Sequence, residues 1–159
     1  MKAYPHRYRV GSSASPEGEV LLSSIGLQPL PTQPPIEFDG PGNRWSPETL
    51  LVGAVVDCFV LSFRAVARAA RLPWLQLRCE VDGVLERAGD AAYFTRFFLD
   101  AHLEVPQGCD PVQAERALHR AEQICLVSNS LRGQRELRAH VQIAAAPRVD
   151  GSTARSEHH

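Results

Sequence analysis

The sequence predicts an α+β fold in which antiparallel sheets pack around one long, buried central helix. Residues 47–72 contain a nearly continuous apolar stretch between a helix start signal and a proline, and residues 75–85 and 93–105 alternate apolar and polar side chains. The length of 159 residues and the hydrophobic fraction of 44% suit one globular domain, which we expect over residues 1–146. The polar residues 147–159 are expected to form a disordered tail.

The first 45 residues are rich in turn-forming residues, with two short segments of strand character, Tyr4–Val10 and Glu19–Ile25. A proline-rich segment, 29–35, follows them. We therefore predict two or three antiparallel strands and then a loop.

The predicted helix begins at Ser46-Pro47-Glu48. Serine can cap the first turn, proline suits the first helical position because its missing N–H had no partner there, and glutamate complements the positive helix end. The helix is expected to run to about Leu72, where Pro73 stops it.

Residues 50–63 of this helix are apolar on almost every side, and Asp57 is their only charge. Because Asp57 interrupts the apolar run, we favour a buried helix over a membrane span. One sheet covers only one side of such a helix. A homodimer, in which a second copy covers the other side, is the simplest solution.

The alternating segments 75–85 and 93–105 predict a hairpin that turns near Ala88–Asp90. Asp110-Pro111 predicts the start of a second helix, which is expected to end near 127–129. Residues 136–144 predict a last strand of the antiparallel sheet. His102 and His119 are interpreted as solvated side chains, and His6 and His140 have no evident partners in the sequence.

The charge balance, 17 Lys and Arg against 18 Asp and Glu, argues against a nucleic-acid partner. Residues 1–10 lack the apolar core of a secretory signal, so a cytoplasmic protein with reduced thiols is expected. The four cysteines are far apart and form no metal-binding motif, so neither a metal nor a cofactor is expected. Cys79 is interpreted as a core residue and Cys109 as an incidental thiol.

Cys58 on the apolar helix, and Cys125 on the second helix, would each suit an inert packed thiol if considered alone. Their surroundings are more specific: SPETLLVGAVVDCF (46–59) and AEQICLVSNSL (121–131). Together these segments resemble the OsmC/Ohr family, in which a Pro-Glu helix start precedes one cysteine by ten residues and a second cysteine follows at similar spacing. The resemblance extends over about residues 4–144.

The resemblance implies an OsmC-like fold, an intertwined homodimer and a thiol-dependent, peroxiredoxin-like peroxidase that reduces organic hydroperoxides under oxidative stress. It assigns Cys58 as the peroxidatic cysteine, Cys125 as the resolving cysteine and Glu48 as the active-site carboxylate. A dithiol, such as a lipoylated protein, is the implied reductant. A sulfenic acid formed on the first cysteine would condense with the second to give a disulfide.

In the family, an arginine stabilises the thiolate, and this chain lacks it at both corresponding places. One place holds Glu37, and the other is the segment 15–19, which contains no basic residue. Burial disfavours a thiolate, and a carboxylate such as Asp57 disfavours it further, so a cation is needed. Arg44 is our first candidate for this cation, and Arg7 and Arg9 are the second choices.

Glu48 and Cys58 are ten residues apart, which is about 15 Å along a straight helix. Glu48 and Arg44 are therefore expected to reach Cys58 from the partner subunit. Two alternatives stay open at this stage: a non-catalytic OsmC-like protein that binds a small molecule, and a thiol redox sensor.

Overall fold

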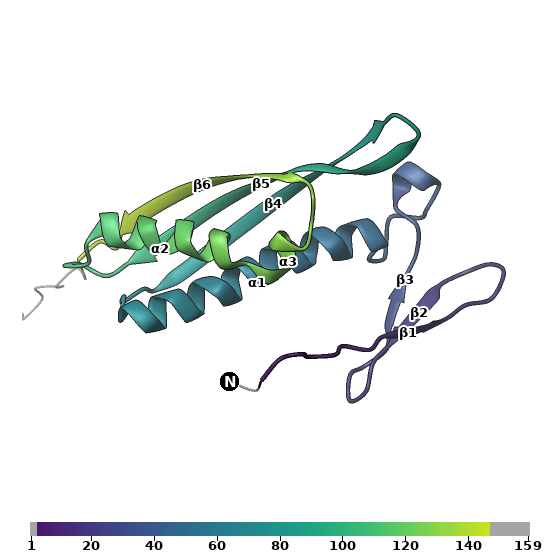
Figure 1. Cartoon of the computed structure of the whole chain (residues 1–159), viewed down its shortest axis with the longest axis horizontal. Coiled ribbons are helices and arrows are strands. Elements are labelled where there is room, and N and C mark those ends of the chain that lie inside the picture. The colour runs from purple at the N-terminus through teal and green to yellow at the C-terminus, as the bar shows by residue number, and fades with distance from the viewer. Residues whose placement is uncertain (1–2, 147–159) are drawn as a thin grey trace, which may run out of the picture. The chain divides into compact units, whose positions relative to one another are not determined.

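The computed structural model describes residues 3–146, so the predicted tail at 147–159 lies outside the described residues. The chain divides between Asp57 and Cys58 into two compact units, and helix α1 (Pro47–Ala70) begins in the first and ends in the second. Each unit contains one small three-stranded sheet, and the second unit adds helices α2 and α3 (Figure 1). The predicted α+β class is confirmed.

The first unit holds strands β1 (Gly11–Ser13), β2 (Val20–Ser23) and β3 (Leu30–Thr32), paired antiparallel in that order. The prediction of two or three antiparallel strands is confirmed, but the strand predicted at 4–10 is wrong. That segment pairs with no described strand, and Tyr8 is 92% exposed. β3 lies within the proline-rich segment, where Pro31 is tolerated because β3 is an edge strand. A 3₁₀ turn, η1 (Ile36–Phe38), follows.

Helix α1 starts where the sequence predicts. The backbone N–H of Thr49 donates to Ser46 Oγ at 3.2 Å, and the N–H of Ser46 donates to Thr49 Oγ1 at 2.8 Å. This reciprocal pair satisfies two backbone donors at the helix start, as in a capping box. The helix ends at Ala70, because Arg71 takes a left-handed conformation (φ 51°) and the N–H of Leu72 returns to the carbonyl of Ala67 at 2.9 Å.

One stripe of α1 is buried, and the rest of the helix is not. The buried stripe follows the four-residue spacing of a helix face: Val55, Phe59, Phe63 and Ala67, each at most 1% exposed. By length and composition, α1 could cross a membrane, and only 22% of its most apolar 18-residue window is buried within the chain. The apolar surface that remains needs a cover that residues 3–146 do not supply.

The second unit is built on strands β4 (Gln76–Ala88), β5 (Ala91–Val105) and β6 (Gln134–Ile143), in that spatial order. β4 and β5 form the predicted antiparallel hairpin. The antiparallel pairing expected for the last strand is wrong, because β6 runs parallel to β5. The connection between them contains helix α2 (Pro111–Ile124), and such a crossover returns the chain in the same direction.

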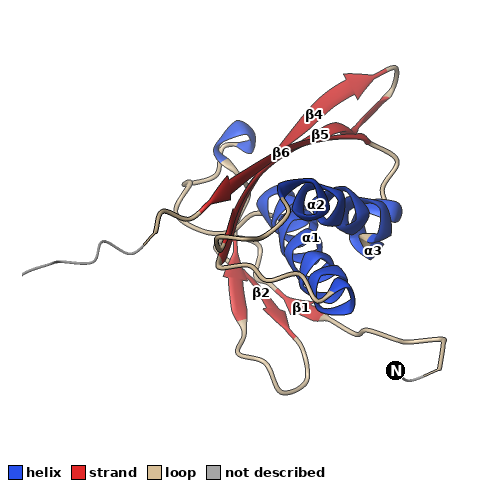
Figure 2. Ribbon diagram, turned by 90° about the vertical axis from the view of Figure 1, so that its left-hand side faces the viewer, coloured by secondary structure: helices blue, strands red, loops and turns tan. Residues whose placement is uncertain are grey.

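The alternation predicted for β5 is confirmed. Its buried side chains form one row: Phe97, Leu99, Ala101, Leu103 and Val105. The end of α1 that belongs to this unit, and α2, lie together on this face of the sheet (Figure 2). Within the second unit, the opposite face carries polar side chains, and none of the helices described in residues 58–146 covers it.

Helix α2 ends earlier than predicted. It starts as expected, with the Asp110 carboxylate accepting from the N–H of Val112 at 2.9 Å, but stops at Ile124. Cys125 then has an extended backbone (ψ 110°), and a separate short helix, α3 (Leu126–Asn129), follows. The side-chain amide of Asn129 donates to the carbonyl of Gln123 at 3.0 Å. This hydrogen bond satisfies one of the backbone carbonyls that have no partner within the last turn of α2.

Candidate redox site

The fold brings Cys58 of α1 and Cys125 of the α2–α3 junction together within the second unit. Cys58 raises the pKa of Cys125 through a side-chain hydrogen bond and through its charge, so the two thiols are direct neighbours. Both cysteines are free thiols. A pair separated by 66 residues of chain thus forms one dithiol site.

The two thiols differ in their surroundings. Cys125 is fully buried, whereas Cys58 is half-buried. Burial is the largest cause that raises the pKa of Cys125 above its ordinary value, and hydrogen bonds from Ser128 oppose it. The Ser128 hydroxyl, itself 2% exposed, donates to Cys125 Sγ at 3.1 Å. At neutral pH, Cys125 therefore keeps its proton, and Cys58 is the more accessible of the two sulfurs.

A polar clip holds the α2–α3 junction against the sheet. Arg135 of β6 forms an ion pair with Glu122 of α2 (Nε to Oε1, 2.9 Å) and donates to Asn129 Oδ1 of α3 at 2.8 Å. Arg135 and Glu122 are only 24% and 19% exposed. Because the clip joins both helices to β6, it fixes the backbone that carries Cys125.

The two other residues expected at the site, Arg44 and Glu48, are both in the first unit. The guanidinium of Arg44 pairs with Glu19 (Nε to Oε1, 2.6 Å), and its side chain is 43% exposed. Glu48 Oε2 is buried and has no hydrogen-bond partner among the described residues. The described chain thus does not pair Arg44 with Glu48, and Asp57 is exposed.

The remaining cysteines stand apart from this dithiol. Burial raises the pKa of Cys79 to about 12, and the charges of Asp100 and Glu80 contribute to the shift. Such a thiol stays protonated and unreactive at neutral pH. Cys109 is half-buried and lies 3.8 Å (Sγ to O) from the carbonyl of Pro73.

Sequence reasoning missed the roles of two sets of side chains. Ser128 lies three residues after Cys125, and this spacing could have indicated a contact within one turn. Asp100, His102 and His140 come together on the polar face of the sheet, whereas the sequence predicts a solvated His102 and indicates no partner for His140. Their meeting depends on the parallel register of β5 and β6, which the sequence did not indicate.

Comparison with known proteins identifies the family to which this chain belongs. The family model described as OsmC-like protein matches residues 40–140, so the chain belongs to the OsmC-like family. The chain is 22% identical over 126 residues to YmaD of Bacillus subtilis, described as an uncharacterized protein, and the match spans 77% of this chain and 79% of that one.

Solved structures share the fold. An OsmC-like protein of unknown function from Vibrio cholerae superposes with a TM-score of 0.75 and 14% identity, covering 88% of this chain and all of that one. An organic hydroperoxide resistance protein, OsmC, from Legionella pneumophila superposes with a TM-score of 0.69 and 23% identity, covering 87% and 98% of the two chains. At these identities the likeness concerns the fold.

Proposed function

We propose that the protein is a cysteine-based peroxidase that reduces organic hydroperoxides through Cys58 and Cys125. The observation that carries this proposal is the dithiol itself, in which an accessible sulfur directly adjoins a buried one. Membership of the OsmC-like family and the fold shared with an organic hydroperoxide resistance protein support it.

The reaction has two steps within the protein. The Cys58 thiolate attacks the distal oxygen of the peroxide ROOH, the O–O bond breaks, and the alkoxide takes a proton to leave as ROH. Cys58 is then a sulfenic acid. The Cys125 sulfur attacks the sulfur of Cys58, hydroxide leaves and is protonated to water, and a Cys58–Cys125 disulfide forms. A dithiol reductant returns both thiols and is itself oxidised to a disulfide.

The different burial of the two sulfurs supports the order of these roles. Peroxide must reach the first sulfur from solvent, and Cys58 is the exposed member of the pair. Cys125 holds its proton because burial raises its pKa, so it does not compete for peroxide and stays reduced until the sulfenic acid forms. The Ser128 hydroxyl stabilises the Cys125 thiolate when that proton leaves.

A homodimer would complete the site. The exposed apolar surface of α1 and the unpartnered Glu48 Oε2 both suit a second copy of the chain packed along this helix. In this arrangement Glu48 reaches the Cys58 thiol of the partner subunit. Arg44 breaks its ion pair with Glu19 and supplies the cation beside that thiol. Burial of α1 in the dimer accounts for its apolar character in a cytoplasmic protein, and a lipoylated protein is a suitable dithiol donor.

Subunit mixing tests the shared site. We expect Glu48→Gln and Cys58→Ser each to lose most activity as pure dimers. If Glu48 serves the partner's Cys58, equal amounts of the two variants form mixed dimers with one intact site, and about a quarter of the native activity returns. No recovery in verified mixed dimers would refute the shared site. An unchanged rate in Arg44→Ala would remove Arg44 from the site.

One observation favours a different role for the same dithiol. Among the hydrogen bonds of residues 3–146, none joins a basic side chain to Cys58 or Cys125, and the Arg44 guanidinium pairs with Glu19 instead. A site without a cation would oxidise slowly. It would suit a redox sensor that forms the disulfide only under stress, or a protein that binds a small molecule without turnover.

A turnover assay with cumene hydroperoxide and dithiothreitol distinguishes these roles. A peroxidase consumes many equivalents of peroxide per chain and loses this activity in Cys58→Ser, while Cys109→Ser serves as the matched control and retains it. Cys125→Ser is expected to lose activity progressively. Its sulfenic acid lacks the resolving thiol, so direct reduction by dithiothreitol competes with further oxidation by peroxide. Disulfide formation without turnover would replace the peroxidase by a sensor, and unreactive thiols would favour a binding protein.

A further inference from the structure

The polar face of the β4–β5–β6 sheet carries a cluster that the thiol chemistry does not use. His102 of β5 is the register partner of His140 on β6, and Asp100 lies two residues before His102 on the same face. Since the buried residues of β5 face the helices, this cluster lies on the side of the sheet away from Cys58 and Cys125.

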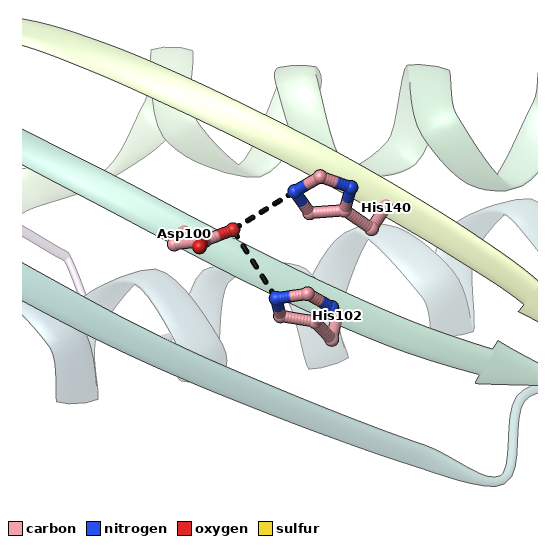
Figure 3. A group of neighbouring side chains, drawn as sticks. All are labelled: Asp100, His102 and His140. Carbon is pink, nitrogen blue, oxygen red and sulfur yellow. Dashed lines mark ion pairs between the residues drawn. The ribbon is translucent and has the colours of Figure 1, made fainter.

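The three side chains converge on one point (Figure 3). Asp100 Oδ1 lies 3.3 Å from His102 Nε2 and 3.0 Å from His140 Nε2, and the three donor atoms all lie within 4.8 Å of one another. Donor atoms bound to one tetrahedral zinc ion at 2.0–2.1 Å are about 3.3 Å apart. The cluster is therefore already close to the spacing that such an ion requires.

A second observation concerns the carboxylate oxygen at the centre. Asp100 Oδ1 is shielded from water, yet it accepts no well-aligned hydrogen bond from any described residue, although it adjoins two imidazole nitrogens. A shielded carboxylate oxygen without an aligned donor is costly unless a charge compensates it. A bound cation would satisfy it and use both imidazoles as ligands.

We propose that Asp100, His102 and His140 form a zinc-binding site on the outer face of this sheet. Two imidazoles and one carboxylate are a ligand set that zinc accepts, and three protein ligands leave further coordination positions for water or an exchangeable anion. The site lies in a surface hollow of about 400 Å³. It is independent of the proposed peroxidase, because it shares no residue with the dithiol.

The imidazole rings need a small adjustment to bind the ion. They are stacked, with centroids 4.4 Å apart and planes inclined by 12°, so their lone pairs run nearly parallel. Rotation about the Cβ–Cγ bond turns both lone pairs toward one point, and this torsion is soft in histidine. The side chains of His102 and His140 are 60% and 53% exposed, so the rings have room to turn.

The charged side chains around the cluster are compatible with a bound cation. Two arginines adjoin the cluster in the strand register, Arg78 beside His102 and Arg138 beside Asp100. Each has its own acceptor: Arg78 donates to Gln76 at 3.4 Å, and Arg138 pairs with Glu136 at 3.6 Å. Two further carboxylates, those of Glu80 and Glu104, line the same hollow and add negative charge.

The test uses the full chain with His158→Ala and His159→Ala, so that the C-terminal histidine pair cannot bind metal. Zinc is titrated against a chelating dye. We expect one zinc per chain, an affinity at least roughly 100-fold weaker in His140→Ala, and a similar loss in His102→Ala, because removing a ligand costs more than removing an outer partner. The matched control is His119→Ala on α2, whose imidazole is 51% exposed and pairs with Glu115.

Cobalt replaces zinc in a second measurement that identifies the ligands. Nitrogen and oxygen ligands give visible d–d bands, whereas a cysteine ligand adds an intense near-ultraviolet charge-transfer band. We expect the d–d bands alone, and their loss in His140→Ala while circular dichroism shows the native fold. Zinc affinity equal in the parent, His102→Ala and His140→Ala would overturn the proposal, as would a charge-transfer band that disappears in Cys58→Ser.

Discussion

Replacing Ser128 by alanine removes the hydroxyl that donates to Cys125 Sγ at 3.1 Å in a buried position. A hydrogen bond to a charged group contributes roughly 1.5–3 kcal/mol and one to a neutral group roughly 0.5–1.5 kcal/mol. The midpoints of these ranges give the bond a preference for the thiolate of about 1.3 kcal/mol. This difference corresponds to roughly a tenfold change in the ionisation equilibrium of the thiol. We therefore expect the pKa of Cys125, already raised by burial, to rise further in Ser128→Ala.

The kinetic effect is smaller than the change in thiolate population. Without this hydrogen bond, about tenfold less of Cys125 is thiolate at neutral pH. A more basic thiolate is also more nucleophilic, with a Brønsted slope of about 0.4–0.5. Disulfide formation should therefore slow about three- to fourfold. The deficit should shrink as pH rises, because both proteins then approach full deprotonation of Cys125. Oxidation of Cys58 by peroxide should keep its rate.

Rapid-mixing experiments separate the two steps. Peroxide consumption in the first turnover reports on Cys58, and trapping of the sulfenic acid with dimedone at timed intervals reports on its decay. Ser130→Ala is the matched control, since the Ser130 hydroxyl donates to the exposed carbonyl of Leu126 at 2.9 Å and touches no thiol. An unaltered decay rate and pH profile in Ser128→Ala would refute the role assigned to this hydrogen bond.

Two further predictions concern the rest of the second unit. Iodoacetamide at pH 8 should label Cys79 far more slowly than Cys109, because a pKa of about 12 leaves little of Cys79 as thiolate, and equal rates would contradict its burial. Leu118→Ala should lower the free energy of unfolding by about 2–5 kcal/mol in urea denaturation, because Leu118 is fully buried, whereas Leu126→Ala, at a position 68% exposed, should change it by less than about 0.5 kcal/mol.

Local chemistry in the sequence was sufficient for much of the fold. The Ser46-Pro47 and Asp110-Pro111 starts, and the alternation along β5, are each determined within a few residues, and the structure confirms them. The direction of β6 is not determined locally. It depends on how α2 crosses the sheet, and the alternation of a strand is the same in either direction.

The candidate site, too, is only partly determined by local sequence. The sequence paired Cys58 with Cys125 through a family resemblance, and the structure makes them neighbours. It did not pair His102 with His140, because their contact depends on the parallel register of β5 and β6. That register places each β5 residue opposite a β6 residue 38 positions later in the chain, across a connection that contains two helices. The position of Glu48 in an assembled site depends on a second chain, and no pattern within one sequence fixes such a contact.

The most direct test of the peroxidase proposal is one oxidation of the reduced protein. A single equivalent of cumene hydroperoxide is added without reductant, and the intact mass and the linked peptides are determined. The account predicts a loss of about 2 Da, from two thiol hydrogens, and one disulfide joining Cys58 to Cys125. An unchanged mass, or oxidation confined to Cys79 or Cys109, would contradict it.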